Sequence, residues 1–526
     1  MAYEDQDPSD EVKELGISTA KKGFIYVGGE IGTSVIVLVL LIFLTRVLQP
    51  AAFGLYSIAI SFAGFLGIAS NFGMGTAFRK MLPGLRSGEI ERARRIVSNG
   101  YYISLSVGIV IAVAGFLLSG VISNSIYHNP TLAVALEIAA LVEFVSVAFN
   151  LTQAALVGFG LVKEATIANT LYSIFYLAGS VILVLLGFGV AGAVSGMLIG
   201  LVVGAAVGLF YAFRKARFLF TGIDKRAAKE ITAFSAPVVA SNIAVQGASS
   251  LSVLLLGAFA ASQVVGNYSS AFRLGRFVEL TVTSINFILL ATFSSALSKK
   301  SVSEKMESIY NNSIYYTSLF MLPLVAFGIA LSEPIVKLLF SSSYTTAPLF
   351  FSIIIAGMAV GMIGTYASSL IIGNGDTRRF MRYQVFAVAM QIALLVVLTP
   401  LYKALGVIVA LFVVTPIVLD IIYIMALKEQ FKIRHRMGGV ARIAVSSVAA
   451  GVILFAISYA MGQRVYAIPV DIVVALAIFP PLLCATMAVG RKNIDFIGNV
   501  GKRLGPLHLI TDVFVNYSKM FLRGGA

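Results

Sequence analysis

The sequence predicts an all-α polytopic membrane protein, and three observations support this fold class. The mean hydropathy is +0.93. Only 12% of the residues are Asp, Glu, Lys or Arg, about half the proportion found in an ordinary soluble domain. Two long stretches, 165–213 and 231–272, carry no formal charge. Because one helix needs roughly 20 apolar residues to span a bilayer, each stretch is long enough for about two crossings.

Helices are the expected element because backbone groups in lipid must form their hydrogen bonds within the membrane-spanning structure. A β-barrel would show alternating segments of roughly ten residues, and the sequence has none. The N-terminus is acidic and polar as far as Lys22, so the first apolar segment is predicted to be a retained helix. The apolar segments predict about 14 transmembrane helices, centred near residues 34, 66, 108, 145, 176, 201, 246, 280, 322, 358, 390, 414, 450 and 479.

The distribution of Lys and Arg predicts the orientation of these helices. With a cytoplasmic N-terminus, 33 of the 39 basic residues lie in cytoplasmic segments and four in outer connections. This bias follows the positive-inside rule. We therefore expect a multi-pass protein of the cytoplasmic membrane with both termini in the cytoplasm. We attribute the net charge of +15 to basic residues at the cytoplasmic surface of the membrane, and we expect no nucleic-acid partner.

Three short matches indicate an internal duplication. They follow one another in the same order, at offsets of 212, 215 and 217 residues, which is unlikely to arise by chance. Since six helices per half is an even number, both halves have the same orientation and an axis along the membrane normal relates them, as in some transporters. An old duplication in a channel or a membrane scaffold is the alternative. The matches are GLYSIA (54–59) with GNYSSA (266–271), LVGFG (156–160) with IIGNG (371–375), and GVAGA (189–193) with GVIVA (406–410).

The predicted organisation is two pseudo-symmetric six-helix lobes followed by two C-terminal helices. In the last segment, apolar residues at three- and four-residue spacing predict a helix on the inner membrane surface, with a plain packed tail as the alternative. The segments are a cytoplasmic tail (1–17), the N-terminal lobe (18–214), a basic cytoplasmic linker (215–228), the C-terminal lobe (229–428), two extra helices (429–490) and a basic amphipathic cytoplasmic tail (491–526).

Several short motifs, taken in order, resemble a known family. They are AKKGFIY (20–26), LTRVLQP (44–50), FGLYS (53–57), NFGMGTA (71–77) and QAALVGFG (153–160). Together they resemble the polysaccharide transporter (oligosaccharide flippase) family of the MOP superfamily, the multidrug/oligosaccharidyl-lipid/polysaccharide exporters. The resemblance is close in the first half and looser in the second.

The resemblance implies a fold of two six-helix bundles that form a V, often with two further helices. It implies a flippase that moves a polyprenyl-diphosphate-linked oligosaccharide to the external leaflet by alternating access, without catalytic chemistry of its own. The implied partners are the lipid-linked oligosaccharide, membrane lipids and glycan polymerase or ligase proteins, and the expected state is a monomer. Spacing and composition alone indicate only a repeat of the kind found in transporters.

The main candidate site lies in the segment centred near residue 280. Arg273, Arg276 and Glu279 follow one another at intervals of three residues and share one helix face. Arg276 is predicted near the membrane centre, where a charge is costly unless it faces a cavity or a partner. Guanidinium groups bind a diphosphate in bidentate geometry. We therefore expect a substrate-binding cavity here; an internal Arg–Glu pair that joins helices is the alternative.

Glu30 and Arg46 are the remaining candidates, both in the first predicted membrane helix. Glu30 stands among Gly28, Gly29 and Gly32, which permit close helix approach. It is a candidate for a coupling proton or a cation, and equally for a buried partner of the arginines. Arg46 ends the helix at the outer surface, where interfacial snorkelling is favoured over a substrate role.

No catalytic, metal or cofactor site is predicted. Cys484 is the single cysteine, which excludes a disulfide framework and a cysteine-based zinc site. His128, His435 and His508 are too dispersed for a metal site. Glu137 and Glu143 do not share a helix face cleanly, so they are interpreted as helix-packing or rim residues.

Three other functions remain as alternatives. A cation-coupled drug or metabolite antiporter of the same superfamily predicts an acidic, aromatic cavity; the arginines argue against it and Glu30 for it. An integral membrane glycosyltransferase or polymerase needs acids and a sizeable outer loop, whereas Asp471 and Glu333 are the only acids near the predicted outer side. A purely structural membrane scaffold would show no transport defect on deletion.

Overall fold

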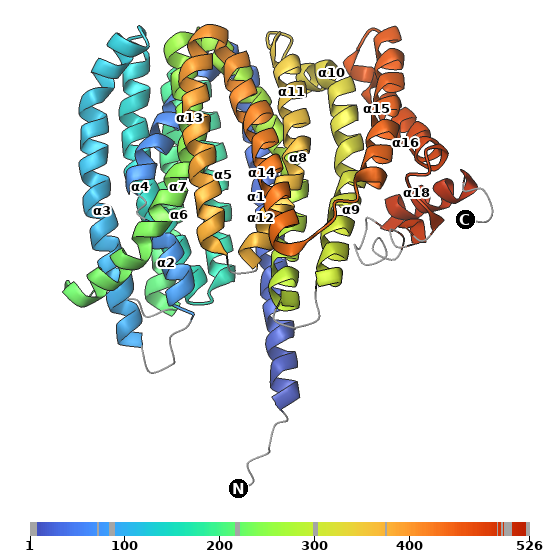
Figure 1. Ribbon diagram of the computed structural model, residues 1–526. Helices are drawn as coiled ribbons and strands as arrows, with labels where there is room; N and C mark the ends of the chain where they lie inside the picture. Colours follow the sequence, from blue (N-terminus) through green and yellow to red (C-terminus); the bar gives the residue numbers. More distant parts are fainter. Residues whose placement is uncertain are drawn as a thin grey trace. The chain divides into compact units, whose positions relative to one another are not determined.

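The computed structural model describes residues 8–70, 73–83, 90–215, 221–297, 303–373, 376–491, 493–495, 498 and 508–521. Every regular element in these ranges is a helix, which confirms the predicted all-α class (Figure 1). The chain forms two compact units, Met1–Gly266 (unit 1) and Asn267–Ala526 (unit 2). The lobe boundaries expected from the sequence stay a prediction.

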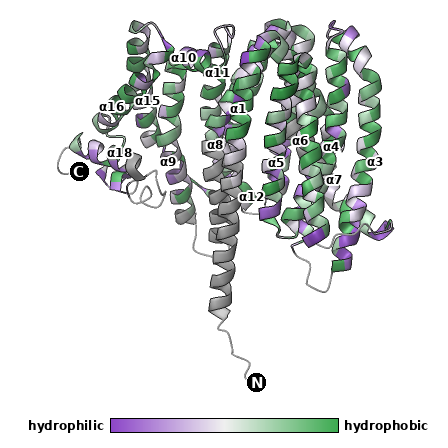
Figure 2. Cartoon of the chain, turned by 180° about the vertical axis from the view of Figure 1, so that it is seen from behind, coloured by the Kyte–Doolittle hydropathy of each residue, from purple (hydrophilic) through white to green (hydrophobic). Residues whose placement is uncertain are grey.

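Within the described ranges, nine helical segments are long and apolar enough to cross a membrane. Hydrophobic residues follow the helices along most of their length, and hydrophilic ones gather near the helix ends (Figure 2). Two of these segments, Val162–Lys215 and Arg378–Phe431, are 54 residues long and contain a break at which the chain reverses. The protein is therefore a multi-pass membrane protein, while the number of fourteen crossings stays a prediction.

Within its described residues, unit 1 contains seven α-helices and the start of an eighth. The first helix is interrupted at Gln49, whose φ of 59° lies in the left-handed region, immediately before Pro50. A proline lacks a backbone N–H and disfavours helical geometry in the residue before it, which accounts for the break. The helices are α1 (Pro8–Ser70), α2 (Met74–Met81), α3 (Ile90–Val121), α4 (Leu132–Gly158), α5 (Val162–Leu183), α6 (Gly189–Lys215), α7 (Lys225–Phe259) and the beginning of α8 (Ser262–Leu297).

The helices α5 and α6 form an antiparallel hairpin that depends on glycine at two places. At the turn, Gly187 and Gly189 have positive φ angles of 92° and 51°, which residues with a Cβ rarely adopt. Along the interface, a Cβ on Gly200 would lie 2.6 Å from the carbonyl oxygen of Tyr172, and a Cβ on Gly204 would lie 2.9 Å from the Tyr172 side chain. The glycines let the two backbones approach closely, as small residues do between membrane helices.

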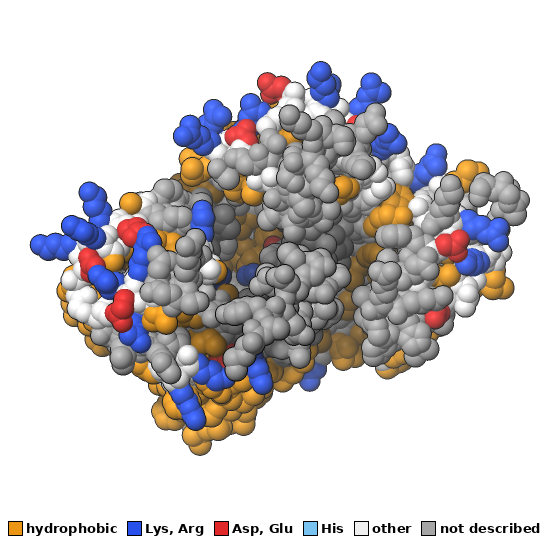
Figure 3. Space-filling model, turned by 90° about the horizontal axis from the view of Figure 1, so that it is seen from below, with side chains coloured by type: hydrophobic (Ala, Val, Ile, Leu, Met, Phe, Trp, Pro, Cys, Tyr) orange, Lys and Arg blue, Asp and Glu red, His pale blue; other side chains and the backbone are white. Residues whose placement is uncertain are grey.

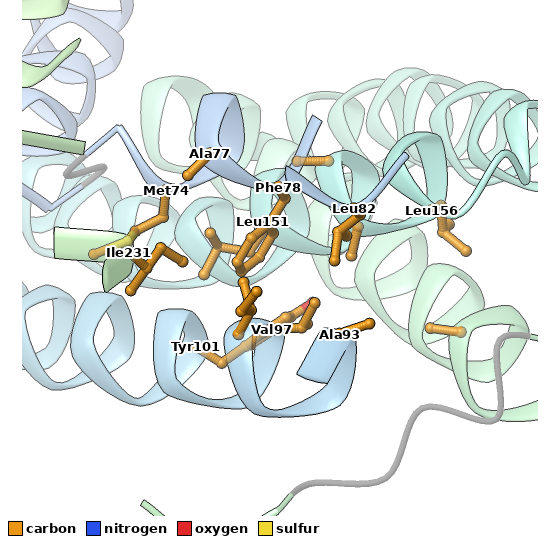
Figure 4. Close-up of a cluster of buried hydrophobic side chains, with 14 of the residues drawn as sticks. Met74, Ala77, Phe78, Leu82, Ala93, Val97, Tyr101, Leu151, Leu156 and Ile231 are labelled. Atoms are coloured by element: carbon orange, nitrogen blue, oxygen red, sulfur yellow. The ribbon is translucent and has the colours of Figure 1, made fainter. Parts of the chain in front are cut away.

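One apolar cluster joins α2, α3, α4 and α7 at one end of unit 1 (Figure 4). Phe78 of α2 is fully buried there, with Tyr101 of α3, Leu151 of α4 and Ile231 of α7. The Tyr101 hydroxyl forms a hydrogen bond of 2.7 Å with the Thr152 hydroxyl, so the polar end of the tyrosine is satisfied. Asp224 caps α7 by accepting hydrogen bonds from the backbone N–H groups of Arg226 and Ala227, and these bonds hold the pKa of Asp224 below its usual value.

Gly54 of α1 and Gly266 of α8 make a reciprocal contact. A Cβ on Gly54 would overlap the carbonyl oxygen of Ser262, and a Cβ on Gly266 would overlap the carbonyl oxygen of Pro50. Each glycine thus packs against the residue four positions before the other. Reciprocal pairs of this kind arise where a two-fold axis relates two segments. The contact therefore supports the duplication hypothesis, in which Gly54 and Gly266 are equivalent.

Within its described residues, unit 2 contains the remainder of α8, nine further α-helices and a 3₁₀ turn. The helix α13 breaks at Lys403, which has a φ of 51° and follows Pro400. Tyr383 and Tyr423 meet with their ring centroids 5.7 Å apart, so α13 and α14 run antiparallel on either side of that break. The helices are α9 (Ser303–Ala330), α10 (Ser332–Leu339), α11 (Ala347–Val360), α12 (Met362–Gly373), α13 (Thr377–Ile408), α14 (Thr415–Phe431), α15 (Met437–Ala460), a 3₁₀ turn η4 (Val465–Ala467), α16 (Ile468–Ala485) and α18 (His508–Phe521).

The C-terminal helices join unit 2 through α9. α15 packs along α9 and α16, and Phe327 of α9 meets Phe479 of α16 edge-on with ring centroids 5.9 Å apart. α18 lies against α16, where Val515 is buried and the Tyr517 hydroxyl donates to the carbonyl oxygen of Ala477 at 3.1 Å. The predicted amphipathic tail therefore contains a helix that packs on the protein.

Candidate functional site

The charged stripe predicted on α8 lies on a face that the core of unit 2 leaves open. The side chain of Arg276 is 67% exposed and that of Glu279 is 47% exposed, and their closest atoms, Nε and Oε2, are 4.0 Å apart. Arg273 is half-buried. At 4.0 Å the Arg276–Glu279 contact stands at the outer limit of an ion pair, so Glu279 compensates Arg276 only weakly.

The opposite face of α8 packs into unit 2. Leu274 and Val278 are buried, and a Cβ on Gly275 would lie 3.0 Å from Ile354 of α11. Arg276 follows Ser262, the first residue of α8, by about 21 Å of helix at ~1.5 Å per residue. If α8 crosses the membrane as predicted, a guanidinium at that position requires water or a negatively charged partner. The stripe has the charge and exposure needed to bind an anion, and its depth in the membrane stays a prediction.

Of the other two predicted site residues, the structure describes the side chain of Arg46 but not that of Glu30. Arg46 is exposed, and its carbonyl oxygen accepts a hydrogen bond of 2.6 Å from the Gln49 side chain, beside the break in α1. The side chain of Glu30 lies outside the described residues. The structure thus shows Arg276 and Glu279 together in a direct contact, and the joint site with Arg46 and Glu30 stays a prediction.

Many basic residues at the helix ends are already paired with acids. Arg92 of α3 binds Glu230 of α7 at 2.8 Å, and Lys215 of α6 binds Glu164 of α5 at 2.5 Å. Lys and Arg side chains are prominent along the margins of the face seen in Figure 3. Exposed pairs such as Arg92–Glu230 contribute little stability individually. They are consistent with the predicted role of the basic segments in orienting the protein.

Glu143 of α4, interpreted from the sequence as a packing or rim residue, is one of two carboxylates that are buried in the middle of an apolar helix among the described residues. Its side chain is only 4% exposed. The Ser70 hydroxyl of α1 donates to Oε1 at 2.5 Å, and the Ser146 hydroxyl donates to Oε2 at 3.2 Å. By contrast, Glu137 on the same helix is half-buried.

The second such carboxylate, Asp420 of α14, was missed in the sequence analysis. It is 6% exposed, and Oδ1 accepts a hydrogen bond of 2.7 Å from the backbone N–H of Gly364. Gly364 stands in the first turn of α12, directly after the interruption at Gly361 between α11 and α12. The first N–H groups of a helix have no acceptor within it, so Asp420 caps α12 from a neighbouring helix.

The two acids near the predicted outer side do not come together in a site. Glu333 pairs with Lys337 on the same helix at 2.5 Å. Asp471 is fully buried, and its Oδ2 accepts a hydrogen bond of 3.2 Å from Ser458. Across the part of the chain that the structure describes, no group of three His, Cys, Asp or Glu side chains is arranged to hold a metal ion.

Sequence comparison matches residues 43–348 of this chain to the family described as "Polysaccharide biosynthesis protein". The matched region is more than half of the chain and runs from α1 to α11. No curated protein matches the sequence.

Solved transporter structures share the fold. A lipid II flippase, MurJ, in an inward closed conformation superposes with a TM-score of 0.73 at 13% identity, covering 87% of this chain and 98% of the flippase. An inward-facing multidrug resistance MATE family transporter of the MOP superfamily superposes with a TM-score of 0.60 at 20% identity, covering 76% of this chain and 96% of the transporter. At these identities the likeness establishes the fold, and the site has to be interpreted from its own residues.

Proposed function

This chain belongs to the polysaccharide biosynthesis protein family, and from that premise we propose that it is a flippase for a lipid-linked oligosaccharide. It moves a polyprenyl-diphosphate-linked glycan across the cytoplasmic membrane by alternating access, for the synthesis of a cell-surface polysaccharide or glycan. The family membership and the transporter fold support the class of function. The solved lipid II flippase is one protein of this fold with an activity of the same kind.

The observation that carries the proposal is the charged stripe on α8. Arg276 is well exposed and only weakly compensated by Glu279, and its predicted position is near the membrane centre. Its planar guanidinium stays charged and presents a fork of donors that fits phosphate oxygens. In the proposed cycle, Arg276 and Arg273 bind the diphosphate while the polyprenyl tail remains in lipid. Because no bond of the substrate is broken, no catalytic residue is required.

The stripe favours a flippase over the antiporter alternative. A cationic drug would be repelled by two arginines on one helix face. The buried carboxylates Glu143 and Asp420 are too enclosed to contact a bulky cation directly. Asp471 and Glu333 lie in separate local contacts, which gives no support to a glycosyltransferase centre.

The proposed orientation places both termini in the cytoplasm, supported by the bias of 33 basic residues inside against four outside. We expect single cysteines at Ser125 and Ser341, in a Cys484→Ser background, to react with an impermeant thiol reagent added outside intact cells. A cysteine at Ser87 should react only after the membrane is permeabilised. The reverse labelling pattern would contradict the orientation.

The decisive experiment measures glycan-lipid flipping by Arg276 variants in proteoliposomes at matched protein content. Loss of a charge-assisted hydrogen bond of about 1.5–3 kcal/mol corresponds to a reduction of about 10- to 100-fold for Arg276→Ala. Arg276→Lys keeps the charge but loses the fork, so it should transport poorly as well. Arg464→Ala, which removes an arginine bonded to the surface residue Tyr466, is the matched control and should flip normally.

An internal packing role for Arg276 predicts a different pattern. Arg276→Ala would then lower the folded yield, and removing Glu279 or Glu30 as well would restore both yield and activity. Normal flipping by Arg276→Ala, or full recovery in the double variant, would refute the proposed binding role.

A further inference from the structure

Glu143 occupies a site that the proposed transport step does not use. It stands about 17 Å along α4 from Leu132 and about 23 Å from Gly158, at ~1.5 Å per residue, and so lies near the middle of a membrane-spanning helix. Its 4% exposure removes it from water and from lipid. A carboxylate in such a place is costly and is a candidate for function by default.

The surroundings of Glu143 are shaped to hold a carboxyl group. A Cβ on Gly67 of α1 would lie 2.6 Å from Oε2, so the glycine leaves the space that the carboxyl fills. Ser70, one turn further along α1, binds Oε1 at 2.5 Å, and Ser146 binds Oε2 at 3.2 Å. Both carboxyl oxygens therefore have a hydroxyl partner, supplied by two different helices.

These hydroxyl partners suit both the charged and the neutral form of the carboxyl. A serine hydroxyl donates to a carboxylate and also accepts from a carboxylic acid. When Glu143 is protonated, its carboxyl O–H donates a hydrogen bond to the Ser70 hydroxyl oxygen. The Ser70 hydroxyl then turns its own hydrogen toward the carbonyl oxygen of Leu66, which lies 3.4 Å from Ser70 Oγ. The same geometry thus serves both protonation states without an unpaired oxygen.

No lysine or arginine stands at the level of Glu143 in the helices described around it. The stretches 47–78, 96–136, 165–213 and 231–272, which supply the packed parts of α1, α2, α3, α5, α6 and α7, contain no Asp, Glu, Lys or Arg. Ser70 and Ser146 are its only hydrogen-bond partners among the described residues. Among the side chains that the structure describes, the titratable ones on the elements packed against α4 are Arg46, Tyr56, Arg79, Lys80, Glu91, Arg92, Arg94, Arg95, Tyr101, Tyr102, Lys163, Glu164, Tyr172, Tyr176, Tyr211, Arg214 and Lys215, with Glu137 on α4 itself. The side chain of Glu30 and those of the other titratable residues in the first part of α1 lie outside the described residues.

The same two turns of α1 that contact Glu143 also contact α7. A Cβ on Gly64 would lie 2.8 Å from the Ser250 hydroxyl, and a Cβ on Gly247 would lie 3.5 Å from the Ile68 side chain. Gly67 and Ser70 on α1 therefore face the carboxyl, while Gly64 and Ile68 face α7. A change in the size or hydrogen bonding of the carboxyl can be transmitted across one helix to the α1–α7 contact.

We propose that Glu143, together with Ser70 and Ser146, is a proton-binding site in unit 1 whose loading and release are coupled to the transport cycle. The proton comes from water on one side of the membrane and leaves to water on the other. The coupling rests on the proposed flippase function, whereas the binding of the proton does not. The ligand is thus a single proton, which needs no further coordinating group.

Infrared difference spectroscopy of the full-length protein in lipid nanodiscs tests proton binding without any transport substrate. Wild type should show a protonated-carboxyl C=O band that grows as the pH is lowered. Glu143→Gln should lack this component, whereas Glu137→Gln, a matched change on the same helix, should retain it. Ser70→Ala should shift the band by removing one hydrogen bond. An unchanged band in Glu143→Gln would overturn the site.

Flipping in proteoliposomes under an imposed pH gradient tests the coupling. With one proton per cycle, a gradient of one pH unit should shift the distribution of the glycan lipid about tenfold in wild type and in Glu137→Gln. Glu143→Gln should flip without responding to the gradient. An equal response in all three proteins would overturn the coupling. Absence of flipping by wild type would refute the proposed function instead, and the infrared result would still decide whether Glu143 binds a proton.

Discussion

Glu143 in unit 1 and Asp420 in unit 2 occupy comparable positions but have different partners. Both are less than a tenth exposed, and each stands about 17 Å from one end of its helical segment, from Leu132 and from Phe431 respectively. Glu143 is bound by two side-chain hydroxyls. Asp420 is bound by the backbone N–H of Gly364 at a helix break.

The difference in partners indicates a difference in role. A hydroxyl rotates and exchanges donor for acceptor, so the Glu143 site tolerates a change in protonation state. A backbone N–H only donates, and its direction is set by the helix, so Asp420 has to keep an acceptor oxygen at one fixed point. Burial of a carboxylate alone therefore does not identify a coupling site; the partners on its oxygens separate a changeable site from a structural cap.

The largest effect is expected from removal of the Asp420 cap. Asp420→Ala leaves the buried N–H of Gly364 without an acceptor, which should cost about 1–3 kcal/mol. Asp420→Asn retains a carbonyl oxygen at Oδ1 and should cost less than about 1 kcal/mol. The thermal unfolding midpoint of the purified protein in detergent measures both changes.

The matched variant in unit 1 is Glu143→Met, which keeps a similar volume and removes both oxygens. Ser70 Oγ already lies 3.4 Å from the carbonyl oxygen of Leu66, so its hydroxyl can find another acceptor. We therefore expect a smaller loss for Glu143→Met than for Asp420→Ala. If the order is reversed, hydroxyl rotation does not account for the difference between the sites.

The sequence predicts the helical class, the family and the position of the α8 stripe because these depend on local patterns. Charge-free stretches give the membrane helices, and the three-residue spacing of Arg273, Arg276 and Glu279 places them on one side of a helix. Comparison with the family model and with the solved structures confirms the fold class and the family resemblance. The break between α5 and α6 is visible in the glycines near residue 188.

The two buried carboxylates could not be assigned in the same way, because their partners come from distant parts of the chain. Ser70 is 73 residues from Glu143, and Gly364 is 56 residues from Asp420. A local signal does exist for Asp420, which is the only acid between residues 377 and 428. A lone acid in a membrane segment indicates a special role, but only the structure shows that this acid caps a helix.

The smallest effect is expected at Gly67, and the sharpest test of the comparison adds a methyl group beside each carboxyl. Gly67→Ala places a Cβ 2.6 Å from Oε2 of Glu143, at the end of a long side chain that can turn aside. Gly364→Ala places a Cβ against Oδ1 of Asp420 and 3.3 Å from Tyr423, and the short Asp420 side chain is held by the backbone N–H of residue 364 itself.

Overpacking typically costs about 1–3 kcal/mol, while alanine recovers about 0.5–1 kcal/mol over glycine within a helix. Gly67→Ala should therefore lower stability by about 1 kcal/mol or less and Gly364→Ala by about 2 kcal/mol, both measured from unfolding midpoints in detergent. Gly32→Ala, where a Cβ would meet no atom within 4 Å, is the control for helix propensity alone and should not destabilise the protein. Equal losses at Gly67 and Gly364 would show that the Glu143 pocket is as rigid as the Asp420 cap, and the proposed exchange of protons there would lose its structural basis.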